Sequence, residues 1–366
     1  MKLSLVVPCY NEQKSLESFS KEIFSILDSI SKDHSNTTLT FECIFVNDGS
    51  KDNTIDLLLA LKAMRSYSPN DKDLAVHNEN IIESKQSITQ DSNPYNLTMP
   101  PNNCEIKVID FTRNFGKEAA MYAGLKESSG DCVVIMDADL QDPPLLLPQM
   151  FKKWLQDEAD IIYARRINRA GEGFIRSRLS EGFYTLHNLI SSVHLESGVR
   201  DFRLLDRQVV NALLSMSEYH RFSKAMFEWV GFRKIGLEYE NIPRHQGSSG
   251  WSLWKLFKYS VEGFISFSTM PLRIAFILGF VMSVFSLGYG LYAIIGALCF
   301  GNVVRGWTSL VALIVFIGGM QLIILGIIGE YIARIYEQVK RRPIYIKRHD
   351  RKRLQPKDSQ LRYKKI

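Results

Sequence analysis

The chain lacks the cysteine patterns that stabilise secreted domains or hold zinc. Its 366 residues include five cysteines, and no two of them form a C-x-x-C pair or another metal-ligand spacing. A disulfide framework and a structural zinc site are therefore not indicated. We expect reduced, mostly buried thiols of a cytosolic domain at Cys9, Cys43, Cys104, Cys132 and Cys299.

The first residues lack two further patterns. No basic segment followed by an apolar core precedes the strand-like run KLSLVVP, so we expect no cleavable signal. The sequons at Asn36 and Asn96 are accordingly expected to stay unmodified. No G-x-G-x-x-G follows that run either, which argues against an oxidoreductase that uses a dinucleotide.

Two long runs near the other end lack charge altogether. Residues 274–300 and 307–329 contain no charged side chain, and each exceeds the roughly 20 residues that cross a bilayer as a helix. A buried core helix is the alternative for each run. Two such runs separated only by GNVVRG favour a transmembrane hairpin, which we place within residues 272–333.

Basic charge is concentrated after this hairpin. Residues 340–366 contain twelve Lys or Arg and two Asp, whereas the formal charge of the whole chain is only +6. The positive-inside rule places the tail, 334–366, in the cytoplasm, and a two-helix hairpin returns the N-terminal region to the same side of the cell membrane. The juxtamembrane position favours a bilayer with anionic headgroups over nucleic acid as the partner of this tail.

Strand-like and helical patterns alternate in the N-terminal region. This alternation predicts an α/β fold with a mostly parallel sheet over residues 1–240. A long polar segment, 66–104, interrupts the alternation, and we interpret it as a surface insertion. The expected strands are 3–7, 42–46, 106–111, 132–136 and 159–164, and the expected helices include 13–30 and 117–128.

Two amphipathic segments connect this domain with the hairpin. Residues 174–190 and 251–268 combine apolar side chains at near-helical spacing with Arg or Lys, which suits helices lying in the headgroup layer. Core-packing helices are the alternative. The second segment runs directly into the first span, so we assign residues 241–271 to an interfacial segment.

The ends of four expected strands are polar and rich in Gly, Asn or Asp: PCYNE, NDGS, TRNFGK and DADLQ. In open α/β sheets, ligands bind beyond the carboxyl ends of the strands, so the four ends predict one binding site. Chance clustering of loop-forming residues is the alternative. Asp137 and Asp139 provide the hard oxygen ligands that Mg²⁺ or Mn²⁺ prefers, and such ions also bind substrate phosphates. Turn formation before two prolines explains Asp142 but not this pair.

The order of the motifs is more specific than any single motif. It resembles that of the family-2 glycosyltransferases of GT-A (Rossmann-like) fold that act on polyprenyl phosphates. The GtrB-like, membrane-anchored bacterial group is the nearest match, and the dolichyl-phosphate mannose synthases are more distant. The resemblance covers nearly the whole chain, and it rests on VVPCYNE, VNDGSKDNT, TRNFGKEAA, VIMDADLQDPP, ARRINR, RDFRLLDR, RHQGSSGW, FSTMPLR and EYIARIYEQVKRRPIY.

The resemblance implies roles for individual residues. Those implied to bind the nucleotide sugar are Pro8, Tyr10, Glu12, Asp48, Lys117, Asp137, Ala138, Gln141, Arg244 and Ser249. Those implied to hold Mg²⁺ or Mn²⁺ are Asp137, Asp139 and Gln141. Those implied to bind the acceptor phosphate are Arg166, Arg169 and Arg203, since guanidinium groups match phosphate geometry. Those implied to be catalytic are Asp201, as a base or an orienting group, Asp139 and Arg166.

Three positions leave alternatives open or depart from the family pattern. Lys117 could instead form a surface salt bridge. Asn47 stands where such families usually have a first aspartate, which leaves Asp48 as the expected uracil partner. Gly250 stands where the family has a lysine, which weakens the expected contribution of the Arg244 loop.

The implied reaction is transfer of a hexose, best assigned as glucose, from a UDP-sugar to undecaprenyl phosphate with inversion. A phosphate whose second ionisation lies near pH 6 needs little help from a base to attack the sugar. Other sugars stay open, and a catalytically degenerate membrane scaffold is the alternative. A processive polysaccharide synthase would need more spans and a Q-x-x-R-W motif. The related group also implies a homo-oligomer, a tetramer, with residues 330–345 returning as a helix along the cytoplasmic face and packing against a neighbouring protomer.

Overall fold

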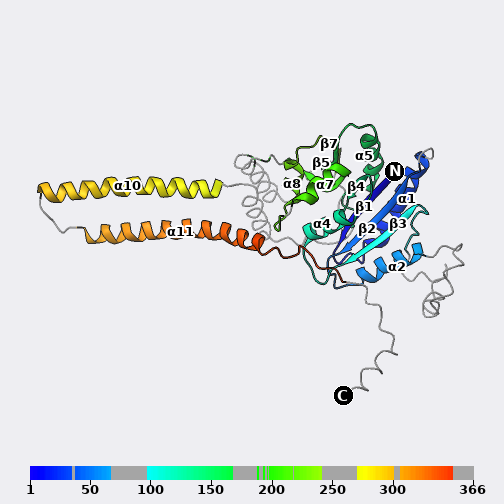
Figure 1. Ribbon diagram of the computed structural model, residues 1–366, viewed down its shortest axis with the longest axis horizontal. Coiled ribbons are helices and arrows are strands. Elements are labelled where there is room, and N and C mark those ends of the chain that lie inside the picture. Colours follow the sequence, from blue (N-terminus) through cyan, green and yellow to red (C-terminus); the bar gives the residue numbers. More distant parts are fainter. Residues whose placement is uncertain are drawn as a thin grey trace, which may run out of the picture.

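A seven-stranded sheet forms the centre of the N-terminal domain in the computed structural model (Figure 1). The structure describes residues 1–34, 38–66, 97–167, 188, 193, 196, 198–216, 218–240, 270–300 and 306–348. The strands are β1 (Lys2–Cys9), β2 (Thr40–Asn47), β3 (Cys104–Asp110), β4 (Cys132–Ile135), β5 (Ile161–Arg166), β6 (Val199–Asp206) and β7 (Lys234–Tyr239). The helices are α1 (Leu16–Asp33), α2 (Thr54–Ser66), α4 (Lys117–Glu127), η2 (Pro144–Leu146), α5 (Leu147–Leu155), α7 (Arg207–Ser215), α8 (Ser223–Trp229), α10 (Met270–Phe300) and α11 (Trp307–Val339).

The sheet has the order β3-β2-β1-β4-β6-β5-β7 and is mostly parallel, which confirms the predicted α/β fold. Only β6 runs antiparallel to its neighbours, β4 and β5. The apolar patterns did not predict β6 as a strand, because Arg200, Asp201 and Arg203 interrupt its apolar residues. The strand therefore brings charged side chains into the middle of the sheet.

Helices cover both faces of the sheet, and alternate strand residues supply the two cores. Cys132 and Val134 of β4 pack in the core on the side of α1, α2 and α5. Val133 and Ile135 pack in the other core, on the side of α4 and α7. This period-2 alternation decides which face each residue at the end of β4 joins.

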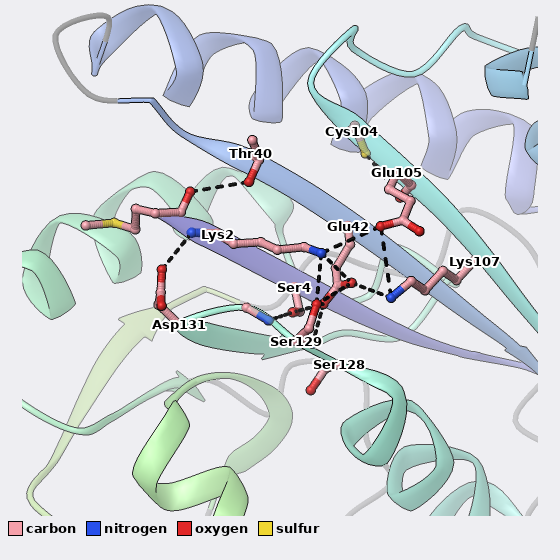
Figure 2. A network of polar contacts seen from close by, with 12 residues as sticks. Lys2, Ser4, Thr40, Glu42, Cys104, Glu105, Lys107, Ser128, Ser129 and Asp131 are labelled. Atoms are coloured by element: carbon pink, nitrogen blue, oxygen red, sulfur yellow. Dashed lines mark hydrogen bonds and ion pairs between the residues drawn. The ribbon is translucent and has the colours of Figure 1, made fainter.

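A buried carboxylate joins three neighbouring strands in the amino-terminal half of β2. The Glu42 side chain has no exposed surface and accepts hydrogen bonds from Lys107 Nζ at 2.8 Å and from the Ser4 hydroxyl and the Ser129 N–H at 2.5 Å each. Lys2 Nζ lies 3.0 Å away on its other side (Figure 2). Burial alone would raise the pKa of Glu42, but these partners lower it to about 2.

Two long apolar helices extend away from this domain, side by side (Figure 1). The segments Met270–Tyr289 and Phe316–Val339 are long and apolar enough to cross a membrane. Large side chains along both helices are exposed, including Phe276 at 73%, Leu287 at 75% and Leu322 at 71%. Because the protein itself leaves these apolar surfaces uncovered, they indicate a membrane-associated hairpin.

The segment after the hairpin differs from its expected arrangement. Residues 330–339 continue α11, and residues 344–348, here called the C-terminal strap, dock on the chain's own N-terminal domain. Thr112 N donates to Ile346 O at 3.0 Å, and Arg348 N donates to Asp110 O at 2.7 Å. The helix expected over 330–345 is therefore present only over 330–339, as a continuation of α11, because the chain beyond it forms an extended segment beside the end of β3.

Side chains of the strap contact α4 and Phe111, which follows β3. The Tyr345 ring stacks on Phe111 with centroids 4.9 Å apart and meets Tyr122 edge-on at 6.3 Å. Lys347 Nζ lies 2.9 Å from the Glu127 carboxylate at the end of α4. Lys347 and Arg348 thus contact the N-terminal domain. Lys340, Arg341 and Arg342, which lie nearest the hairpin, are exposed, and with the residues beyond 348, outside the described part, they remain available as the predicted lipid-binding tail.

The end of α11 also contacts the loop before α8. Tyr219 N donates to the Gln338 side chain at 2.8 Å, and His220 pairs with Glu337. The first residue of α8, Ser223, donates in turn to the Glu118 carboxylate of α4 at 2.9 Å. Hydrogen bonds through this loop and the first residue of α8 therefore connect the end of α11 with α4.

Glu42→Gln should lower the free energy of unfolding by about 3 kcal/mol at pH 7, because the folded pKa of about 2 lies below the unfolded value of about 4.3. A lowered folded pKa gives stability that is complete above the unfolded value and is lost as the pH falls through the folded value. The difference from wild type should therefore shrink to about half at pH 3 in urea titrations of the detergent-solubilised protein.

Glu105→Gln is the matched control, since this carboxylate is 56% exposed and contacts the same two lysines at 3.6 and 4.0 Å. This substitution should lower the free energy of unfolding by less than about 1 kcal/mol. Equal stability losses for the two variants would contradict the assignment of Glu42 as a buried ion-pair centre.

Tyr345→Ala should loosen the strap, because it removes a stacked aromatic contact worth about 1.4 kcal/mol, or about a factor of ten in opening. Trypsin cleavage after Lys347 should accelerate about tenfold in the native protein. Ile346→Ala, at a side chain 50% exposed, is the control and should change the rate little. Equal rates for Tyr345→Ala and wild type would show that the strap is not held by this contact.

Candidate functional site

The site lies where β4 ends and β6 begins. Ile135 pairs with Arg203 in the antiparallel register of these strands, and continuing the register places Asp137 opposite Asp201. The period-2 alternation puts both carboxylates on the face covered by α4. Cross-strand neighbours lie about 5 Å apart, so two like charges at these positions repel each other.

Lys117, the first residue of α4, relieves this repulsion. Its Nζ donates to Asp137 Oδ2 at 2.7 Å and to Asp201 Oδ2 at 2.5 Å. The three side chains are 41%, 24% and 19% exposed, so the cluster is half-buried but open to solvent on one side. One cation thus holds together the two carboxylates that the resemblance assigns to the donor and to the catalytic step.

The charges of this cluster follow from burial and proximity. Burial raises the pKa of Asp201, but the adjacent Lys117 charge more than offsets this and holds it well below its usual range. Burial lowers the pKa of Lys117, and the two carboxylates raise it above its usual value. The pKa of Asp137 is raised by burial and by Asp201, although Lys117 opposes both effects. At neutral pH, Lys117 is therefore charged and Asp201 is ionised.

Asp48 holds the beginning of α4 in place. It is only 4% exposed, and its carboxylate accepts hydrogen bonds from Phe115 N at 2.6 Å and from Gly116 N at 3.0 Å. The preceding loop passes close to Gly49, where a Cβ would lie 2.4 Å from the Arg113 carbonyl carbon. The Asp48 carboxylate thus binds the loop that positions Lys117, and its direct contact with uracil stays a prediction.

The remaining donor residues lie at the end of β1. Tyr10 is 42% exposed, and the backbone after it is tied to the loop that follows β2. Asn11 N donates to Ser50 Oγ at 3.0 Å, and Glu12 N donates to Thr54 Oγ1 at 2.9 Å. Pro8 is the last residue but one of β1, and Ala138 follows the end of the neighbouring strand β4 by three residues. The structure thus brings the donor residues it describes to the carboxyl ends of the parallel strands.

The arginines predicted to bind the acceptor phosphate lie in different environments. Arg166 ends β5 and is half-buried. Arg203 is only 2% exposed, its guanidinium lies 3.7 Å from the Phe227 ring centroid, and its Nη2 donates to Arg200 O. We therefore revise its predicted contact with the acceptor, because a guanidinium packed against an aromatic ring inside the core does not face a ligand. Arg169, Arg244 and Ser249 lie outside the described residues.

Two residues beside the site were not predicted. Glu118 follows Lys117, and burial raises its pKa to about 7 while it caps α8 through Ser223. Arg200 precedes Asp201 and points to the other face of the sheet, where it contacts Gln141 and Asp142. The signal for Arg200 was present in RDFRLL, because adjacent strand residues face opposite sides and its neighbour was already a site residue.

The oxygen atoms at the end of β4 suit a hard divalent cation. No cluster of three or more His, Cys, Asp or Glu residues that could hold a metal occurs in the part of the chain that the structure describes. Asp137 and Asp139 with the amide of Gln141 form a smaller set, in which Asp139 is exposed. This set fits Mg²⁺, which commonly binds one or two carboxylates and completes its coordination with water and substrate phosphates.

Known proteins match the chain over nearly its full length. A model described as glycosyl transferase family 2 matches residues 4–78 and 89–214, and one described as the GtrB C-terminal hairpin matches 270–335. The SfII prophage-derived bactoprenol glucosyl transferase of Shigella flexneri is 39% identical over 346 residues, which cover 94% of this chain and 97% of that protein. The bactoprenol glucosyl transferase of Shigella phage SfV is 38% identical over 353 residues, covering 96% and 100%.

Part of the chain also aligns with a solved structure, at lower sequence identity. Glucosyl-3-phosphoglycerate synthase from Mycobacterium tuberculosis, crystallised with Mn²⁺, UDP-glucose and phosphoglyceric acid, is 17% identical, with a TM-score of 0.39. The alignment covers 72% of this chain and 77% of that one.

A double-mutant cycle tests the bridge between the carboxylates. Lys117→Met should destabilise the protein by about 2 kcal/mol, because it leaves two like charges opposite each other, and adding Asp201→Asn should recover at least about half of the loss. Urea titrations measure the coupling. Lys126→Met, at an exposed lysine on the same helix, is the control. Strictly additive effects of the Lys117 and Asp201 substitutions would show that the ion pair is not formed.

Proposed function

Because the chain belongs to glycosyl transferase family 2, we propose that it transfers glucose from UDP-glucose to a polyprenyl phosphate in a membrane. One combination of features supports this proposal most strongly: a carboxylate cluster at the strand ends is followed in the same chain by an apolar hairpin. A lipid acceptor with a phosphate head needs both parts. The names of the two Shigella relatives support the choice of glucose and of bactoprenol as the acceptor lipid.

The donor is held at the edge formed by β1, β2 and β4. The exposed Tyr10 ring provides an apolar surface for the base, and Glu12 and the loop after β2 lie beside it. Asp137, Asp139 and Gln141 would hold a Mg²⁺ or Mn²⁺ ion, which when bound neutralises the diphosphate of the leaving UDP. Lys117 keeps Asp137 in place from the opposite side.

The acceptor phosphate approaches from the side of β5 and β6. Its oxygen forms the new bond to the anomeric carbon as the bond from that carbon to the UDP oxygen breaks, so an α-linked donor gives a β-linked product. A phosphate dianion needs no proton removed, and Asp201, held ionised by Lys117, orients the acceptor instead. Arg166, with Arg169, supplies the positive charge that attracts the phosphate.

The membrane arrangement follows from the same chemistry. The isoprenoid stays in hydrocarbon while its phosphate lies at headgroup depth, so the site must stay close to the bilayer. We propose a protein that spans the cell membrane twice, with the catalytic domain and C-terminus in the cytoplasm, according to the positive-inside rule. Assembly into a homo-oligomer is a prediction of the family resemblance alone.

The test is to incubate the full-length protein with undecaprenyl phosphate, Mn²⁺ or Mg²⁺ and a panel of nucleotide sugars, and to determine the mass of the lipid product by mass spectrometry. UDP-glucose should give a hexosyl lipid, and Asp139→Asn should reduce kcat at least about 100-fold. Asp28→Asn, on the exposed face of α1, should leave kcat unchanged.

Product from another nucleotide sugar alone would overturn the assignment of glucose. No UDP release with any donor would favour the catalytically degenerate scaffold. Full activity of Asp139→Asn would contradict the role of the β4 end in catalysis.

A further inference from the structure

The loop that leaves β4 has a conformation that needs external support. Leu140, between Asp139 and Gln141, has a φ of +56°, in the left-handed region that non-glycine residues rarely adopt. Among the described residues, the only hydrogen bond within this loop runs from the Gln141 N–H to Asp139 Oδ1, at 3.1 Å. A single turn of this kind does not hold a residue in a costly conformation, so neighbouring elements must do so.

Arg200 supplies this support from β6. Its Nε donates to Asp142 Oδ1 at 2.8 Å, and its Nη2 donates to Gln141 Oε1 at 3.1 Å. The planar guanidinium thus contacts two consecutive loop residues at once, which a lysine cannot do with the same geometry. Asp142 is 2% exposed, and it also accepts a hydrogen bond from the Tyr239 hydroxyl of β7 at 2.6 Å.

The position of Arg200 in β6 relates this contact to the catalytic cluster. Arg200 and Asp201 are neighbours in one strand, so their side chains leave opposite faces of the sheet. Asp201 reaches Asp137 through Lys117 on one face, and Arg200 reaches Gln141 and Asp142 on the other. The two contacts hold the chain on both sides of Asp139.

We propose that Arg200 is a positioning residue that holds the Asp139–Asp142 loop in the shape required to bind a divalent cation together with the UDP diphosphate. This inference rests on the proposed function. Arg200 acts through Gln141 and the buried Asp142 and does not itself touch the donor. The Arg200 guanidinium can only donate, so it selects the oxygen end of the Gln141 amide, and Gln141 Oε1 then keeps one lone pair for a cation.

Arg200→Gln should weaken Mn²⁺ binding to the UDP-loaded protein about tenfold or more, as is typical for the loss of a residue that orients a metal ligand. The measurement is the free Mn²⁺ signal in electron paramagnetic resonance titrations, which needs neither sugar nor lipid. Arg200→Lys, which keeps the charge but not the two-pronged contact, should recover part of the affinity. The KM for undecaprenyl phosphate should change less than about twofold.

Arg233→Gln is the matched control, because Arg233 also contacts two acidic residues, Asp157 and Asp160, but on the exposed side of β7. It should leave Mn²⁺ affinity unchanged. Asp142→Asn covers the case in which Arg200→Gln does not fold, since it weakens the same contact with little change in shape and should also weaken Mn²⁺ binding. Arg200→Gln should add little to the effect of Asp142→Asn.

The outcomes separate this inference from the function on which it rests. Wild-type protein that binds no Mn²⁺ in the presence of UDP would refute the metal site itself. Mn²⁺ binding that is normal in wild type and equally tight in a folded Arg200→Gln would overturn the role of Arg200 alone. A variant that loses only thermal stability, with unchanged Mn²⁺ affinity, would likewise show that Arg200 is merely structural.

Discussion

One ammonium group between two carboxylates is the interaction on which the site depends. The antiparallel pairing of β4 with β6 brings Asp137 and Asp201 face to face, and this arrangement is unfavourable without a cation between them. Lys117 is that cation, and it can reach both only because α4 begins at this point. Asp48 fixes the beginning of the helix, so a buried cap controls the electrostatics of the site.

The same helix connects the site to the membrane. Glu118 caps α8, whose preceding loop contacts the end of α11, and Tyr122 meets the strap residue Tyr345. The orientation of Lys117 and its two carboxylate partners relative to the hairpin is therefore set by packing as well as by the connecting chain. For an enzyme whose acceptor phosphate stays at headgroup depth, this connection fixes the height at which the reaction takes place.

Sequence predicted those features that depend on local pattern. The alternation of strands and helices and the two uncharged helices are confirmed by the structure, because each needs only neighbouring residues. Features that depend on tertiary contacts were not predicted. Arg203 was assigned to a ligand, although packing against Phe227 makes its burial possible. Lys347 was included in the lipid-binding tail, although it pairs with Glu127 of α4.

The most direct measurement of the central claim is a structure of the full-length protein with UDP and Mn²⁺. The account predicts Mn²⁺ at Asp137 and Asp139, beside the diphosphate, with Lys117 still bound to Asp201. Mn²⁺ and UDP located elsewhere in the domain, or Lys117 turned away from both carboxylates, would contradict it.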